Sequence, residues 1–359
     1  NDVALAGLNH KLGWRGTTNT LLNFGEGKYR PGGQAGAVGY LVGKPGEGLR
    51  CMFHMMNEAR IQVGLGATML GYAGYEAALD YARQRPQGRP SGPSGKDPGI
   101  PQQTIIHHPD VRRMLLAQKA YAEGGLALGL YCAQLVDDKA TGDAAAADEA
   151  AALLELLTPI AKSWPSEWCL EANSLAIQVH GGYGYTRDFP VEQHWRDNRL
   201  NMIHEGTHGI QAQDLLGRKV RAEDGRAFKL WIERVQKIAA HARQVDLFAP
   251  LADALEDAAA LLGSATQAAW GQQRADVAVY NAMGYLRGFG HIVLAWLWLD
   301  LCICATKQLD LAKGDSALLR GKIEAGRYFF TYELPQVQAW LAPVIDADNQ
   351  FAMLDTDVL

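Results

Sequence analysis

The stretch that most constrains the fold is residues 178–220, in which glycine turns alternate with short helical patterns. Apolar residues at 191–203 recur near the 3.6-residue helical period. The pattern then breaks at Gly206, and glycine inside a helix costs about 1 kcal/mol relative to alanine. We therefore expect one helix to end before the bend at 205–206 and another to begin after it, with Thr207 as its N-cap.

The bend contains the letters HEGTH, which leave more than one interpretation open. In a zinc-dependent hydrolase, His204 and His208 would bind the metal and Glu205 would activate a water. That site needs an unbroken helix and a third ligand, whereas Gly206 interrupts the helix and position 214 is aspartate. In the second interpretation, Glu205 is a base beside a helix start that favours an anion. A purely structural alternative is that Glu205 caps a neighbouring helix.

The order and spacing of the motifs resemble the C-terminal catalytic segment of the acyl-CoA dehydrogenases. That family typically shows Q-I-x-G-G-x-G-[FY], then P-V-E, R-D and I-Y-E-G-T-x-x-I-Q. This chain reads QVHGGYGY at 178–185, PVE at 190–192, RD at 196–197 and IHEGTHGIQ at 203–211. The departure is His204, where the family usually has tyrosine. The resemblance extends over about residues 8–220.

The resemblance implies FAD-dependent α,β-dehydrogenation of an acyl-CoA thioester to the trans-2-enoyl-CoA. It implies that Glu205 takes the α-proton while hydride passes to N5 of FAD. By the same resemblance, Arg60, Asn57 and Gly206 belong to the substrate site, and no metal is expected. The residues expected at the cofactor are Arg85, Gln178, Gly181, Gly182 and Thr207.

The resemblance also implies partners and missing parts. The reduced flavin is expected to pass electrons to an electron-transferring flavoprotein, and the chain is expected to form a homodimer or a dimer of dimers. Because the chain starts at Asn1 in what looks like the end of a central β-domain, we expect an N-terminal portion to be absent. A further alternative is a non-catalytic helical assembly module whose site is incomplete without that portion.

Composition narrows the class of protein. The 359 residues are 48% apolar with a net charge of −5, which is typical of a soluble globular protein and argues against nucleic acid as a partner. Five cysteines form no paired framework, so we expect a reducing, cytoplasmic location. The most apolar run, 292–304, is too short to span a bilayer and is expected to be a buried helix, with no integral membrane segment.

The predicted fold class is mainly α: the C-terminal helical bundle of the family, preceded by a β-domain remnant and followed by an extra helical bundle. The predicted domains are 1–48, 49–220 and 221–359. Strands are expected at 17–24 and 37–43. The remaining helices are expected at 49–85, 109–138, 144–152 and 160–179, the last starting at Pro159 and Pro165, and then at 226–245, 250–285, 288–313 and 316–342.

Overall fold

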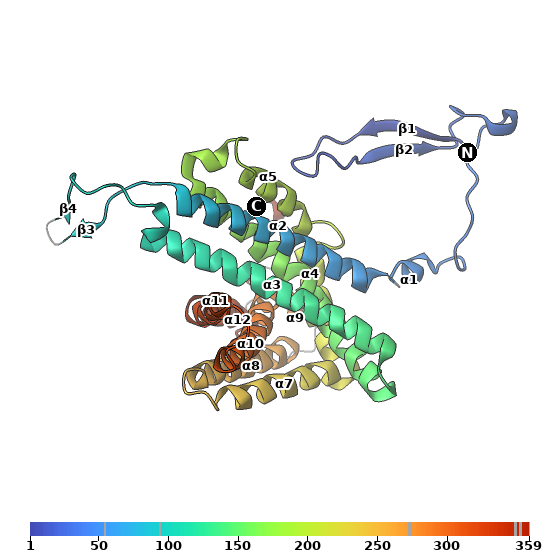
Figure 1. The fold of residues 1–359 in the computed structure, drawn as a ribbon. Coiled ribbons are helices and arrows are strands. Elements are labelled where there is room, and N and C mark those ends of the chain that lie inside the picture. The colour runs from blue at the N-terminus through green and yellow to red at the C-terminus, as the bar shows by residue number, and fades with distance from the viewer. Residues whose placement is uncertain (54, 93–94, 272–274, 348–349, 352–353, 359) are drawn as a thin grey trace. The chain divides into compact units, whose positions relative to one another are not determined.

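The computed structural model describes residues 1–53, 55–92, 95–271, 275–347, 350–351 and 354–358. Contacts divide the chain into two compact units, residues 1–59 and residues 60–359. Figure 1 shows that long helices dominate the second unit, whereas the first contains the β1–β2 hairpin. The predicted fold class, mainly α with a small β remnant, is confirmed.

The first unit contains one antiparallel hairpin, formed by β1 (Val3–Leu8) and β2 (Thr20–Phe24). The buried carboxylate of Asp2 lies at its base and accepts hydrogen bonds from the N–H groups of Tyr29 at 3.0 Å and Gly27 at 2.6 Å. These bonds, that from Tyr29 above all, lower the pKa of Asp2. The short helices η1 (Pro31–Gly33) and α1 (Gly48–Phe53) follow in this unit.

The predicted strand at 37–43 is wrong. The Asn1 side chain bonds the backbone of Val38, but no described strand pairs with the segment. Tyr40 is 91% exposed. A strand needs a partner to satisfy its backbone groups, and β-prone residues alone cannot supply one.

Three long helices form the framework of the second unit: α2 (Met56–Gln84), most of which lies in this unit, α3 (Pro109–Thr141) and α4 (Ala144–His180). The helix predicted at 49–85 is divided, because α1 and α2 are separate helices and residue 54 lies outside the described residues. The prediction at 109–138 is confirmed by α3. The two predicted segments at 144–152 and 160–179 are one continuous helix, α4.

Pro159 and Pro165 were predicted at the start of a helix. This prediction is wrong, because both lie inside α4. Proline lacks the N–H that bonds the carbonyl four residues earlier, which usually ends a helix. Both prolines are buried here, so packing on all sides sustains the helix through them. Pro165 leaves the Ala161 carbonyl without its helical donor. Gly64 of α2 approaches that carbonyl so closely that a Cβ would lie 1.9 Å from its oxygen.

Short elements connect the long helices and carry the segment highlighted by the sequence. The predicted helix at 191–203 is α-helical only as far as Asn198 and continues as a 3-10 turn. In chain order the short elements are β3 (Ser91–Gly92), β4 (Gly95–Lys96), η2 (Ile105–His107), η3 (Gly181–Tyr185), α5 (Val191–Asn198), η4 (Arg199–Met202), α6 (His208–Gly217) and η5 (Lys219–Arg221).

The C-terminal helices follow the predicted pattern with shifted boundaries. They are α7 (Ala222–Ala242), α8 (Ala249–Trp270), α9 (Ala275–Ala278), α10 (Ala282–Asp310), α11 (Ser316–Tyr328), the π-helix η6 (Phe329–Glu333), α12 (Gln336–Ile345) and η7 (Thr356–Val358). The single helix predicted at 250–285 is wrong, because α8 ends at Trp270 and α10 begins at Ala282; residues 272–274 lie outside the described residues. The single helix predicted at 316–342 is likewise interrupted, by η6.

Helix α10 is the buried centre of the C-terminal helices, as its all-round hydrophobicity predicts. It contacts α6, α7, α8, α11 and α12, and also α3 and α4 of the framework. One hydrophobic core therefore runs from α3 and α4 through to α12. By length and composition α10 would suffice to cross a membrane, but 78% of its most apolar window is buried in the protein, as in the core helix of a bundle.

Candidate active site

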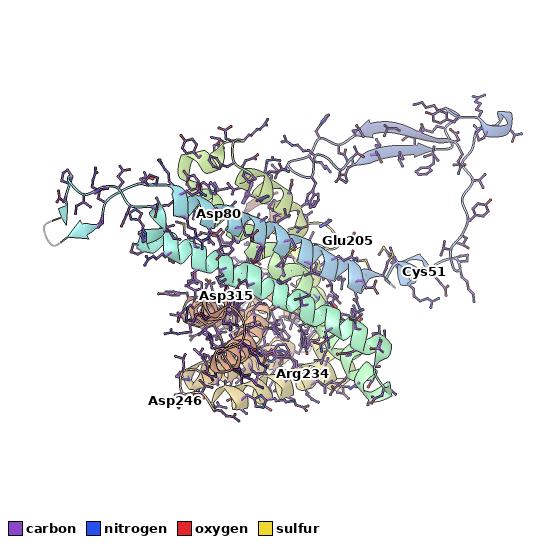
Figure 2. The ribbon with its side chains drawn as sticks, in the orientation of Figure 1. Cys51, Asp80, Glu205, Arg234, Asp246 and Asp315 are labelled. Atoms are coloured by element: carbon purple, nitrogen blue, oxygen red, sulfur yellow. The ribbon has the colours of Figure 1, made fainter. Side chains whose placement is uncertain are left out.

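The turn between η4 and α6 has an unusual backbone conformation. Glu205 has a φ of 54° and Gly206 a φ of 88°, so both are left-handed. Glycine adopts such angles freely, whereas glutamate needs surroundings that hold it there, and such strain concentrates at functional sites. The bend predicted at 205–206 is confirmed. The side chain of Glu205, labelled in Figure 2, is exposed.

Two fully buried side chains hold this turn from the protein interior. Lys162 of α4 donates to the Gly206 carbonyl at 2.8 Å, and Gln211 of α6 donates its amide to the Glu205 carbonyl at 3.1 Å. A Cβ at residue 206 would lie 2.6 Å from Gln211 Nε2. Glycine is therefore required at 206 both by its φ angle and by space.

Arg60 lies buried beside the same turn. Its Nη1 donates to Asp214 Oδ2 on α6 at 3.0 Å, an ion pair between residues 154 positions apart. Its Nε is buried and has no hydrogen-bond partner among the described residues. Burial, together with the charge of Arg60, lowers the pKa of Lys162 to about 8. Lys162 thus lies close both to Glu205 and to a second buried cation, Arg60, whose own charge is paired with Asp214.

A chain of amides connects the residue before Glu205 to the framework helices. His204 Nε2 lies 3.1 Å from Asn201 Oδ1, and Asn201 donates to Asn198 Oδ1 at 2.9 Å. Asn198 in turn donates to Asn173 Oδ1 on α4 at 2.7 Å and to the Ala67 carbonyl on α2 at 3.1 Å. Burial lowers the pKa of His204, which favours the neutral imidazole. The turn is therefore held on both sides.

The zinc interpretation finds no support. A metal-binding helix would have to continue from His204 to His208, but the chain leaves helical structure between them and α6 begins only at His208. Burial lowers the pKa of His208 to about 4. Among the residues that the structure describes, no group of three or more His, Cys, Asp or Glu side chains is arranged to hold a metal ion.

A cavity of about 590 Å³ lies where α4 ends and η3 begins. This volume is in the usual range for small-molecule sites. Four residues that the sequence assigned to the cofactor line it: Arg85, Gln178, Gly181 and Gly182. One wall is formed by Tyr81 and His180, whose rings stack with centroids 4.3 Å apart.

The cavity and the Glu205 turn lie far apart along α2 and α4. Arg60 and Arg85 are separated by nearly the whole of α2, which at 1.5 Å per residue is roughly 36 Å. Lys162 and Gln178 are separated by roughly 24 Å along α4. Figure 2 labels Glu205 and Asp80, the latter near the end of α2, toward opposite ends of that helix.

Comparison with known proteins supports the family resemblance of the sequence motifs. The family model "Acyl-CoA dehydrogenase, C-terminal domain" matches residues 46–219, and "Acetyl-CoA dehydrogenase C-terminal like" matches residues 231–355. A 3-methylmercaptopropionyl-CoA dehydrogenase of Ruegeria pomeroyi is 34% identical over 97% of this chain and 57% of its own length. A broad-specificity linear acyl-CoA dehydrogenase, FadE5, of Mycobacterium tuberculosis is 31% identical over 99% of this chain and 59% of its own length.

The chain belongs to the acyl-CoA dehydrogenase family. It spans less than two thirds of the length of these relatives. Two solved structures share its fold. Caenorhabditis elegans ACDH-11 in complex with C11-CoA has a TM-score of 0.72 at 20% identity, over 95% of this chain and 52% of the other. A Bacillus anthracis acyl-CoA dehydrogenase complexed with FAD has a TM-score of 0.71 at 17% identity, over 97% of this chain and 58% of the other.

The structure brings the residues expected at an acyl-CoA dehydrogenase site together in two groups. Glu205, Gly206 and Thr207 form the turn, with Arg60 nearby, whereas the other cofactor residues line the distant cavity. Thr207 occupies the N-cap position of α6 as predicted, but its side chain makes no capping hydrogen bond. Asn57 lies in the first turn of α2, in the first unit, and its assignment to the substrate stays a prediction.

Sequence reasoning missed Lys162, Gln211 and Asp214, which hold or neutralise groups around the turn. Lys162 offers a signal in retrospect, because it is a lysine in the otherwise apolar run LLTPIAKSW, within a helix that is buried on all sides. A lysine in such a position is rarely buried without a partner. Which group it faces could not be read from the pattern.

Proposed function

We propose that this chain carries the catalytic base of an acyl-CoA dehydrogenase, which converts an acyl-CoA thioester to the trans-2-enoyl-CoA. The observation that supports this most is Glu205, an exposed carboxylate in a left-handed turn held by two buried side chains. Family membership supplies the substrate class, since the relatives are named for acyl-CoA substrates. These names differ in acyl group, so chain length is left open.

The chemistry asked of Glu205 is removal of a proton from the carbon next to the thioester carbonyl. That proton is weakly acidic, so a base must be held close and in the right orientation. The left-handed turn can hold Glu205 in a fixed position, because Lys162 and Gln211 bind two consecutive backbone carbonyls, those of Gly206 and Glu205. By the family resemblance, the Glu205 N–H helps to hold the thioester oxygen. Bound FAD supplies the hydride acceptor for the neighbouring carbon.

The cavity fits a part of FAD. Gly181 and Gly182 leave open space on its wall, where an added Cβ would meet no atom within 4 Å, and Arg85 adds a cation suited to a phosphate. Gln178 completes the group that would hold the cofactor there. Thr207 would contact the cofactor at the turn.

The distance between these two places favours an assembly of two chains. Because roughly 36 Å of helix separates Arg60 from Arg85, one cofactor would not contact both groups within one chain. We propose a homodimer or a dimer of dimers, in which the cavity of one chain serves the cofactor used by the turn of another. An electron-transferring flavoprotein is the proposed electron acceptor, on the family resemblance alone.

The test of the proposed function is Glu205→Gln in the FAD-loaded protein. The variant is expected to bind FAD and acyl-CoA normally and to bleach its flavin at least ~100-fold more slowly, since general-base removal has at least this effect. The measurement is anaerobic stopped-flow absorbance with saturated acyl-CoAs of several chain lengths. Glu324→Gln, which removes an exposed carboxylate on α11, is the control. A near-normal rate for Glu205→Gln would refute the assignment.

A further inference from the structure

Lys162 is an unusual buried charge. Its side chain is fully buried in α4, and the Gly206 carbonyl at 2.8 Å is its only hydrogen-bond partner among the described residues. Within the same residues no carboxylate lies within ion-pair distance of its ammonium group. A buried ammonium group without a paired carboxylate destabilises a fold strongly. Such a group is a candidate for a functional role.

Lys219 provides an internal comparison. It is also buried, with 5% of its side chain exposed, and burial likewise lowers its pKa to about 8. Unlike Lys162, it forms an ion pair with a carboxylate, that of Glu155. Its position in η5 places it outside the Glu205 turn. Lys219 therefore has the features of a structural buried lysine, whereas Lys162 has a single partner, and that partner is the residue after the base.

The Gly206 carbonyl is the part of the turn on which the conformation of Glu205 depends. Lys162 holds this carbonyl and Gln211 holds that of Glu205, so two consecutive peptide planes are oriented from the interior. A hydrogen bond from a charged donor is roughly twice as strong as one between neutral groups. Without the ammonium group, the Gly206 carbonyl would keep only its longer contact of 3.5 Å with the Gln211 amide, so Glu205 would be held less firmly in its strained left-handed conformation.

We propose that Lys162 is a positioning residue for the proton abstraction assigned to Glu205: its ammonium group holds the Gly206 carbonyl and thereby keeps the base in its left-handed turn. This inference rests on the proposed function. Lys162 acts through the backbone and touches neither substrate nor cofactor. Burying this ammonium group without a carboxylate partner lowers the stability of the fold, but it places the group against the Gly206 carbonyl.

The charges around Lys162 define an expected pH dependence. It faces Arg60 from α2, His204 and Glu205 from the turn and His208 from α6. Because both histidines have lowered pKa values, the group that titrates nearest to pH 8 is Lys162 itself, with a pKa of about 8. Loss of its proton replaces a charge-assisted bond with a weaker one. The rate of α-proton removal is therefore expected to fall as the pH rises through about 8.

The experiment compares Lys162→Met, Lys162→Gln and the control Lys219→Met in the FAD-loaded protein. Lys162→Met is expected to lose roughly 100-fold in kcat, the effect of a misplaced catalytic group, with KM little changed. Its loss of rate near pH 8 should disappear, and its melting temperature should not fall. Lys162→Gln, which keeps a neutral donor, should recover part of kcat. Lys219→Met should keep the wild-type kcat and pH profile.

A second readout does not depend on catalysis. Hydrogen exchange of the Gln211 amide, which donates to the Thr207 carbonyl of the turn at 3.0 Å, is expected to accelerate in Lys162→Met and not in Lys219→Met. Wild-type kcat in both Lys162 variants, or unchanged exchange at the turn, overturns the proposal. If Lys162→Met does not fold, Lys162→Gln decides in the same way. If the wild-type protein oxidises no acyl-CoA, the proposed function fails, but amide exchange still decides whether Lys162 holds the turn.

Discussion

At the residue scale, the two buried lysines differ in their partners, and one of them holds the turn that contains the strained Glu205. Lys162 and Lys219 both have a pKa lowered to about 8 by burial, from an ordinary value of 10.5. Each shift corresponds to about 3 kcal/mol of stability lost while the lysine is charged. Lys219 forms an ion pair with Glu155, whereas the hydrogen-bond partner of Lys162 is a backbone carbonyl.

These pKa shifts predict how stability depends on pH. The unfolded lysines keep their protons up to about pH 10.5, and the folded ones lose them near pH 8, so the unfolded state binds more protons in this window. The free energy of unfolding should therefore contain a contribution that rises from pH 8 to 10. Urea unfolding at several pH values should show a shallower rise in Lys162→Met and in Lys219→Met. Identical slopes in wild type and variants would contradict the prediction.

At the element scale, the contact between α2 and α4 sets the geometry beneath the turn. Pro165 frees the Ala161 carbonyl, Gly64 approaches it, and Lys162 is the next residue along α4. Two helices can approach this closely only where one of them lacks a side chain. The position of the Lys162 ammonium group therefore depends on a glycine that lies about a hundred residues earlier in the chain.

This contact can be tested with two glycines of the same helix. Gly64→Ala places a Cβ 1.9 Å from the Ala161 oxygen, and such overpacking typically destabilises by about 1–3 kcal/mol. Gly66→Ala has no atom within 4 Å of its new Cβ and should gain up to about 1 kcal/mol from helix propensity. Urea midpoints measure both changes. Equal effects of the two substitutions would show that the α2–α4 contact is not the cause.

At the scale of the whole molecule, the C-terminal helices share one core with the helices that carry the site. Trp298 of α10 is fully buried and donates to the Ala120 carbonyl of α3 at 3.3 Å. Arg287 of the same helix pairs at 2.7 Å with Glu167 of α4, whose carboxylate lies 3.7 Å from His208. Through Glu167, α10 thus supports His208, the residue that begins α6 directly after the turn. The predicted boundary at 220/221 stays a prediction.

A shared core predicts cooperative unfolding of residues 60–359. Trp298→Ala should destabilise by about 3–5 kcal/mol, as expected when a buried tryptophan is removed. The loss should appear as one transition, detected equally by circular dichroism and by fluorescence of the remaining tryptophans. Two transitions, with the helices before residue 221 keeping their wild-type stability, would contradict the prediction.

The sequence by itself determined the helical class, the family and the bend at Glu205. The family followed from the resemblance of its ordered motifs, whereas the helices and the bend follow from local causes: apolar periodicity, and Gly206, which ends a helix and accepts a left-handed φ. The errors arose where local sequence was not sufficient. The β-prone residues at 37–43 have no described strand to pair with. The prolines at 159 and 165 gave no sign of the burial that keeps α4 continuous there.

Only the tertiary structure decided what surrounds Glu205. The bond from Lys162 to Gly206, the pairing of Arg60 with Asp214 and the separation of the cavity from the turn all join residues far apart in the chain. Burial and hydrogen bonding are properties of pairs, and the identity of a distant partner leaves no periodic signal in either segment. The role proposed for Glu205 was therefore suggested by its neighbours in sequence, whereas the groups that hold it were revealed only by its neighbours in space.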